Sequence, residues 1–213
     1  MELRKWIASL MSILLLAGCD SLISSSIDRN EKVMKEITLS ENEEVMFSLL
    51  ADQIYYFEFQ DRLKQFQSVE IGVDYYHYGE LIDSMGGMKI GANHPELEGK
   101  DERARFLFTL DSLEEGEDLT FSGTLKVLFD SGSAGSTGYS FNREGVKRGA
   151  SSWGYLLDQF DDVPIGEKVY TAYFVENVES EHLRTLNYEE AIQQNDEYEH
   201  LFLYYVQIED EPL

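Results

Sequence analysis

The stretch Leu119–Phe129, with the sequence LTFSGTLKVLF, decides the fold class of this chain. From Leu119 on, every second position except Gly123 carries a large apolar side chain. These apolar residues are Leu119, Phe121, Leu125, Val127 and Phe129. The positions between them are mostly polar. A period of two places successive side chains on opposite faces of a β-strand. We therefore predict a long strand with one face in a core.

Similar patterns recur and predict further strands. The candidates are Glu36–Leu39, Gln53–Phe59, Ser68–Tyr76, Leu81–Met85, Arg105–Leu110, Tyr139–Phe141, Trp153–Leu157, Lys168–Val175 and Leu201–Ile208, with one more apolar run at Val45–Leu50. Turn residues separate them about every 8–12 residues, as in β-sandwiches, and the β–α alternation of doubly wound folds is missing. We predict a mainly β fold: an antiparallel β-sandwich or jelly-roll-like domain of about ten strands, with one or two short helices.

Local signals predict several connections. Gly79 within His77–Glu80 predicts a hairpin turn, and Gly86-Gly87 predicts a bulge or bend. Asn187 is expected to cap a short helix that ends near Gln194. The Gly/Ser-rich segment Asp130–Gly138 is expected to be a flexible connection between strands.

The N-terminus carries a separate signal. Two basic residues precede an apolar stretch and two small residues: Arg4, Lys5, Trp6–Leu16, Ala17 and Gly18. This is the pattern of a secretory signal peptide. The tetrapeptide Leu16-Ala17-Gly18-Cys19 contains the one cysteine of the chain and resembles the lipobox of bacterial lipoproteins. The resemblance implies cleavage between Gly18 and Cys19, a diacylglycerol thioether on Cys19, and a lipid anchor on the extracytoplasmic face of the cell membrane.

Two alternative interpretations of this segment are weaker. A transmembrane helix needs about 20 apolar residues, but the apolar run stops at Gly18. An ordinary signal peptide would leave a free thiol in a secreted protein, which is unusual. Asp20 would favour retention at the inner membrane in a Gram-negative lipoprotein but has no such meaning in Gram-positive bacteria, so the envelope type stays open. We expect a signal peptide at 1–18, a lipidated cysteine and tether at 19–35, and a single domain at 36–213.

The chain is strongly acidic. It has 17 Lys and Arg residues against 41 Asp and Glu residues, and its formal net charge is −24. Nucleic acid is excluded as an expected partner because phosphate binding needs clustered cations. Anionic lipid headgroups would repel this surface, so attachment to the membrane must come from the lipid anchor. The charge fits solubility, or contact with basic proteins or divalent ions.

Acidic clusters are the first candidates for a binding site. Calcium, which takes 6–8 oxygen ligands, is the expected ion for the best of them, formed by Asp158, Asp161, Asp162 and Glu167. Two further clusters are Glu96, Glu98, Asp101 and Glu102, and Glu114, Glu115, Glu117 and Asp118. None has EF-hand spacing. No other cofactor is expected.

Aromatic and histidine residues are further candidates for a binding site. Tyr75, Tyr76 and Tyr78 at the hairpin tip are candidate ligand-binding aromatics, and cross-strand packing is the alternative. The four histidines, His77, His94, His182 and His200, are scattered and have no ligand spacing. No Gly-x-Ser-x-Gly nucleophile motif occurs.

These features predict a membrane-anchored, extracytoplasmic and non-catalytic lipoprotein whose acidic sandwich binds a protein, a glycan or another cell-envelope component. Two alternatives remain. One is a carboxylate-based envelope enzyme acting on glycan, which would need two carboxylates about 5–10 Å apart in a cleft. The other is a purely structural envelope-maintenance lipoprotein.

Overall fold

The computed structural model describes residues 32–49, 51–61, 67–91, 102–115, 118–130, 134–143, 149–157, 159–161, 163–177, 183, 185–193 and 195–210. All of these belong to one compact unit, Glu31–Leu213. The predicted cleavage site at Gly18 and the predicted lipidation site at Cys19 lie outside the described residues. None of the helices in the described part has the length and apolar character of a transmembrane segment.

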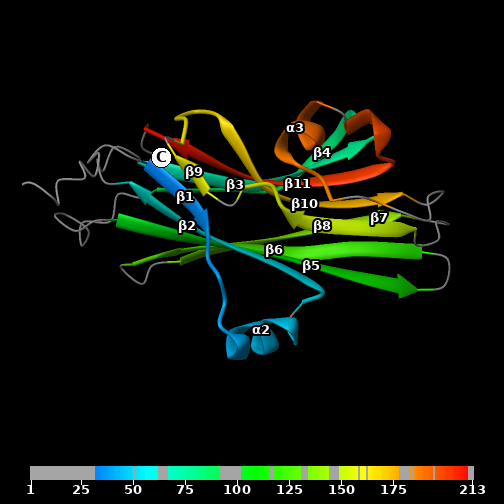
Figure 1. Ribbon diagram of the computed structural model, residues 1–213, viewed down its shortest axis with the longest axis horizontal. Coiled ribbons are helices and arrows are strands. Elements are labelled where there is room, and N and C mark those ends of the chain that lie inside the picture. Colours follow the sequence, from blue (N-terminus) through cyan, green and yellow to red (C-terminus); the bar gives the residue numbers. More distant parts are fainter. Residues whose placement is uncertain are drawn as a thin grey trace, which may run out of the picture. The chain divides into compact units, whose positions relative to one another are not determined.

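The described residues form eleven strands in two antiparallel sheets that pack face to face (Figure 1). Sheet A has the order β7-β6-β5-β2-β1-β9, with β1 (Lys32–Glu36), β2 (Gln53–Asp61), β5 (Glu102–Glu115), β6 (Asp118–Phe129), β7 (Ala134–Arg143) and β9 (Gln159–Asp161). Sheet B has the order β4-β3-β11-β10-β8, with β3 (Ser68–His77), β4 (Glu80–Gly91), β8 (Ala150–Tyr155), β10 (Lys168–Asn177) and β11 (His200–Glu209). The predicted β-sandwich of about ten strands is confirmed.

The main hydrophobic core fills the space between the sheets. The apolar face of β6 is buried as predicted, and its Phe121 packs on Phe202 of β11 with ring centroids 5.3 Å apart. Each such side chain stabilises the fold by about 1.5–3 kcal/mol through removal from water. Buried phenol groups also find partners across the core, since the hydroxyls of Tyr139 and Tyr204 are 2.8 Å apart.

A second apolar cluster covers the outer face of sheet B. Here α3 (Tyr188–Gln193) and the 3₁₀ turn η2 (Asn195–Glu197) lie beside β10 and β11 (Figure 1). The expected cap of α3 is confirmed, because the Glu190 amide donates to Asn187 Oδ1 at 3.0 Å. Parts of β10 and β11 are therefore buried on both faces.

The hairpin between β3 and β4 follows the prediction. Its two turn residues, Tyr78 and Gly79, have φ angles of 45° and 81°. Two left-handed residues in a two-residue loop match the twist of paired strands. The predicted bulge is also present, since Gly86 and Gly87 together face Gly72 between two regular residue pairs.

Two expectations near the start of the domain are corrected. The strand expected at Glu36–Leu39 lies earlier, as β1 at Lys32–Glu36, because Met34 is the side chain that enters the core. The apolar run Val45–Leu50 overlaps a helix, α2 (Glu41–Ser48). Ser40 and Glu43 begin this helix, with the Ser40 amide donating to Glu43 Oε2 at 2.9 Å.

The segment Asp130–Gly138 is the third correction. Its second half, Ala134–Gly138, is not a loop but the start of β7, which pairs with β6. The glycine content reflects close packing, since a Cβ at Gly135 would lie 2.2 Å from Ile90 Cδ1 of β4. Small residues let the edges of the two sheets approach each other here.

Candidate functional site

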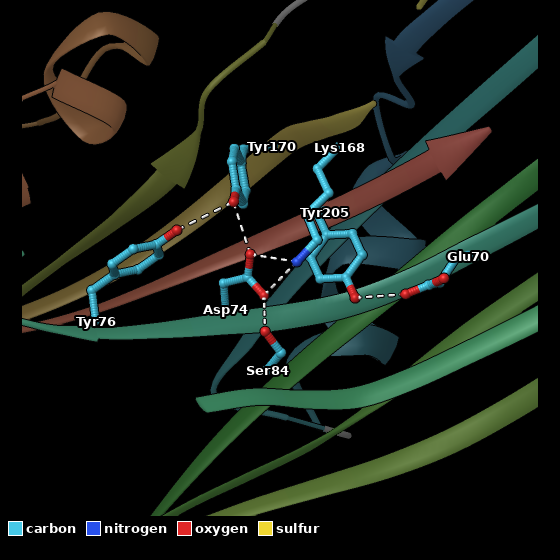
Figure 2. A network of polar contacts seen from close by, with 7 residues as sticks. All are labelled: Glu70, Asp74, Tyr76, Ser84, Lys168, Tyr170 and Tyr205. Atoms are coloured by element: carbon cyan, nitrogen blue, oxygen red, sulfur yellow. Dashed lines mark hydrogen bonds and ion pairs between the residues drawn. The ribbon is translucent and has the colours of Figure 1, made fainter. Parts of the chain in front are cut away.

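A polar network lies on the outer face of sheet B (Figure 2). The alternation of β3 turns Val73 and Tyr75 inward and Asp74 and Tyr76 outward. Neighbouring strands add further side chains beside them. We call the resulting set the platform, and it consists of Glu70, Asp74, Tyr76, Ser84, Lys168, Tyr170 and Tyr205.

Asp74 is the centre of the platform. Its side chain is 1% exposed and accepts two bonds from Lys168 Nζ, at 2.8 and 2.9 Å. The hydroxyls of Tyr170 and Ser84 also donate to it, at 2.8 and 2.6 Å (Figure 2). A buried carboxylate is costly unless it is paired and hydrogen-bonded. Four hydrogen bonds from three groups, one of them the Lys168 cation, satisfy that condition.

Tyr205 lies across Gly72, because the glycine has no side chain to occupy that space. It pairs directly with Gly72, where a Cβ would lie 2.5 Å from the Tyr205 hydroxyl oxygen. In this position the ring lies 4.0 Å beneath Lys168 Nζ, within the range of a cation–π contact. Its hydroxyl donates to Glu70 Oε1 at 3.1 Å. Gly72 therefore allows the tyrosine, and the tyrosine orients the lysine.

The phenol groups of the platform stay protonated well above neutral pH. Burial, the hydrogen bond with Tyr76 and the nearby Asp74 carboxylate raise the pKa of Tyr170. Burial and Glu70 raise the pKa of Tyr205 in the same direction. Both hydroxyls therefore act as fixed donors to carboxylates. Tyr205 is buried, whereas Tyr76 and Tyr170 are partly exposed, so the network fixes two tyrosine side chains that a ligand can still contact.

A second polar group, which we call the inner cluster, lies inside one end of the sandwich. It consists of Tyr75, Arg143, Glu176 and His200, which all point inward. Arg143 Nη1 donates to Glu176, whose side chain is fully buried, and Glu176 also accepts from the Gly149 amide at 2.9 Å. Arg143 Nε and Nη2 have no hydrogen-bond partner among the described residues.

Comparison with protein families gives one match, to the YgaN domain over residues 33–208. The match spans the chain from β1 to β11. This chain belongs to the YgaN domain family. No curated protein and no solved structure was found to match it. The family name states no activity, so the chemistry of the YgaN domain rests on its side chains.

The three tyrosines predicted at the hairpin take different positions in the YgaN domain. Tyr75 is buried in the core against Phe141, at a ring distance of 4.3 Å. Tyr76 belongs to the platform, with its hydroxyl 3.3 Å from that of Tyr170. Tyr78 is 54% exposed at the turn. The three side chains therefore do not form one stacking surface.

The predicted calcium cluster is mostly outside the described residues. Asp158 and Asp162 lie outside them, and so does the side chain of Asp161, whose backbone ends β9. Glu167 is exposed. Calcium binding by this cluster stays a prediction. In the other two clusters, the residues with described side chains are Glu114 and Asp118, and both are exposed.

Sequence reasoning missed two groupings in the YgaN domain. Lys168 is 94 residues from Asp74, and His200 follows His77 by a still longer stretch, yet each pair lies together. No sequence spacing reveals these pairs, because they depend on which strands are neighbours. The one available signal was strand parity, which placed Asp74 on the polar face of its strand.

Proposed function

We propose that this protein is a lipid-anchored, extracytoplasmic and non-catalytic binding module that recognises a cell-envelope component through the platform. The lipobox-like Leu16–Cys19 supports the anchor and the location. The observation that carries the binding role is the saturated Asp74 carboxylate beneath partly exposed tyrosines. A rigid aromatic surface of this kind loses little conformational entropy on binding.

The contacts of the described carboxylates support binding over catalysis. A general base needs a free lone pair directed at a substrate. Both oxygens of Asp74 already accept bonds from Lys168. A cavity of about 300 Å³ between the sheets is lined by one carboxylate, Asp52, and its Oδ2 accepts from the Ser112 hydroxyl at 2.8 Å. No second carboxylate is among the residues that line this cavity, so it lacks the pair that the enzyme alternative requires.

The chemistry of the platform indicates the class of partner. Tyrosine is enriched at binding surfaces because it combines a large apolar ring with a hydroxyl. Lys168, with its side chain 32% exposed, adds one cation to a chain of net charge −24. This combination suits a polar, uncharged or weakly basic ligand, such as an envelope glycan or a segment of an envelope protein.

Sedimentation with isolated cell-wall material tests the binding role. Tyr76→Ala removes a partly exposed ring of the platform, and we expect it to weaken binding about tenfold. Leu128→Ala is the matched control, because it removes an exposed apolar side chain from sheet A instead. Equal binding by both variants and the unchanged protein would reject the platform as the binding surface.

The anchor has its own test. Cys19→Ser removes the thiol that would carry the lipid, and we expect the variant to appear in the soluble extracytoplasmic fraction of the native host. Mass spectrometry of the unchanged protein should find an acylated N-terminal cysteine. Membrane retention of the variant, or an unmodified thiol, would count against lipidation.

A further inference from the structure

Three potential ligand groups meet beside the inner cluster. His77 ends β3, while Glu199 and His200 lie at the start of β11, and one ligand atom of each lies within 4.8 Å of the others. Two backbone contacts hold this arrangement. The Tyr78 amide donates to the Tyr198 carbonyl at 3.0 Å, and the Glu199 amide donates to Asn177 Oδ1 at 2.7 Å. The hairpin tip is thus tied to the segment that carries the other two residues.

His200 is oriented before any ligand binds. Its side chain is 7% exposed, and its Nδ1 lies 2.7 Å from the Tyr75 hydroxyl. Its ring also stacks on that of His77, with centroids 5.1 Å apart. A metal-bound histidine is usually supported by a hydrogen bond at one imidazole nitrogen, which directs the other nitrogen toward the ion. Tyr75 supplies that support here.

The other nitrogen of His200, Nε2, is the atom available to bind a metal ion. His200 Nε2 is buried and makes no hydrogen bond with any described residue. It lies 3.2 Å from Glu199 Oε1. Two ligands of one tetrahedral zinc ion stand about 3.3 Å apart, given bonds of about 2.0–2.1 Å. The imidazole and the carboxylate already have that separation.

The charges nearby are compatible with a cation. The charge of Arg143 is balanced by its ion pair with Glu176. Glu199 then supplies the negative charge that faces the site.

We propose that His77, Glu199 and His200 bind a divalent transition-metal ion of the zinc class. Two imidazoles and one carboxylate form a ligand set that zinc accepts, with water in the fourth position. Calcium and magnesium prefer all-oxygen sites, so they bind weakly here. His77 is partly exposed, and a ligand atom of this side chain within 4.8 Å of the other two supplies the third protein ligand. This site is separate from the platform and from the predicted calcium cluster.

The test is calorimetric titration of the full chain with Zn²⁺ after removal of metals. We expect one high-affinity ion per chain, and a loss of affinity of about tenfold or more in His77→Gln and in Glu199→Gln. His94→Gln and His182→Gln are the matched controls, since they remove the two other histidines of the chain. Their affinity stays unchanged.

Melting curves provide a second measurement. Zn²⁺ raises the melting temperature of the unchanged protein and of the two controls, but not that of His77→Gln, whereas any shift caused by Ca²⁺ is the same in His77→Gln as in the controls. Absence of Zn²⁺ binding, or equal Zn²⁺ affinity in His77→Gln and the controls, would overturn the proposal. Circular dichroism confirms that each variant keeps its β structure, and Glu199→Gln repeats the test at a second position.

Discussion

The platform and the inner cluster both contain a buried carboxylate, but the two carboxylates differ in their hydrogen bonds and in the exposure of the paired cation. Asp74 accepts from four donor hydrogens, and its cation, Lys168, is one-third exposed. Glu176 is fully buried, and its partner Arg143 is 4% exposed with two nitrogens unpartnered among the described residues. In the platform the buried carboxylate oxygens have hydrogen-bond partners, whereas the inner cluster contains buried nitrogens without hydrogen-bond partners among the described residues.

This difference predicts how each region responds when the partner of its buried charge is removed by mutation. A charge at the edge of solvent can turn to water when its partner is removed, so the loss is partial. A charge inside the sandwich has no such alternative and keeps its full desolvation cost. Buried polar groups without hydrogen-bond partners are also unusual in native proteins, so those beside the inner cluster favour a bound ligand there.

Glu176→Gln should give the largest loss of stability. It leaves the Arg143 guanidinium buried without a counter-ion, which costs about 3–5 kcal/mol of unfolding free energy. Urea denaturation measures the change. Glu58→Gln is the matched control, because Glu58 pairs with Arg103 and Arg105 at 3.9 and 3.5 Å on the outer face of sheet A, where the cations are exposed. A loss below about 1 kcal/mol in Glu176→Gln would contradict the contrast.

Asp74→Asn should have an intermediate effect. The amide keeps the size of the side chain but loses the charge that Lys168 faces, so we expect a loss of about 1.5–3 kcal/mol. Lys168 can extend into water, which limits the cost. Urea denaturation is again the measurement, with exposed Asp83→Asn of β4 as the control. If Asp74→Asn cost as much as Glu176→Gln, exposure of the partner cation would not explain the difference.

Alkaline pH should weaken the platform through Tyr170. Its pKa is raised in the folded state, so above pH 10 the unfolded chain releases this proton while the folded chain retains it. Stability from this group is complete below pH 10 and falls as pH rises, by at most about 1.4 kcal/mol per pH unit. Tyr170→Phe removes the effect. The stability advantage of the unchanged protein over Tyr170→Phe should therefore shrink between pH 10 and 11, and a constant difference would refute the raised pKa.

Ser84→Ala should have the smallest effect. It removes one donor from Asp74, while Lys168 and Tyr170 still donate to the same carboxylate. We expect a loss of about 1 kcal/mol or less in urea denaturation. Ser140→Ala, on an exposed position of β7, is the control. A loss near that of Asp74→Asn would mean that the network is not redundant.

Much of the fold could be predicted because alternation acts locally. The faces of Ser68–Tyr76 and Leu119–Phe129 follow directly from a period of two. The failures arose where a local signal was overlooked or overridden. Ser40 and Glu43 form a capping box that marks α2, and this signal was available in the sequence. The glycines before Tyr139 predict a loop locally, because the close contact of Gly135 is with Ile90, which lies on another strand.

The alternation of inward and outward side chains is also interrupted within β10, at a point that no local sequence pattern indicates. The register of β10 against β11 shifts between Tyr170 and Ala172, so both Tyr170 and Tyr173 contribute to the outer face of sheet B. An uninterrupted alternation would send one of them inward. The platform depends on this bulge, because Tyr170 can contact Asp74 on the outer face while Ala172 and Phe174 of the same strand point into the core.

The β-sandwich class, the inward and outward faces of the main strands, and the prediction of a lipid anchor at Cys19 follow from the amino-acid sequence alone. These features depend on neighbours along the chain. The contacts of Lys168 with Asp74 and of His77 with His200 become visible only in the folded protein. In a sheet, lateral neighbours come from distant parts of the chain, and their pairing is set by the packing of the whole core.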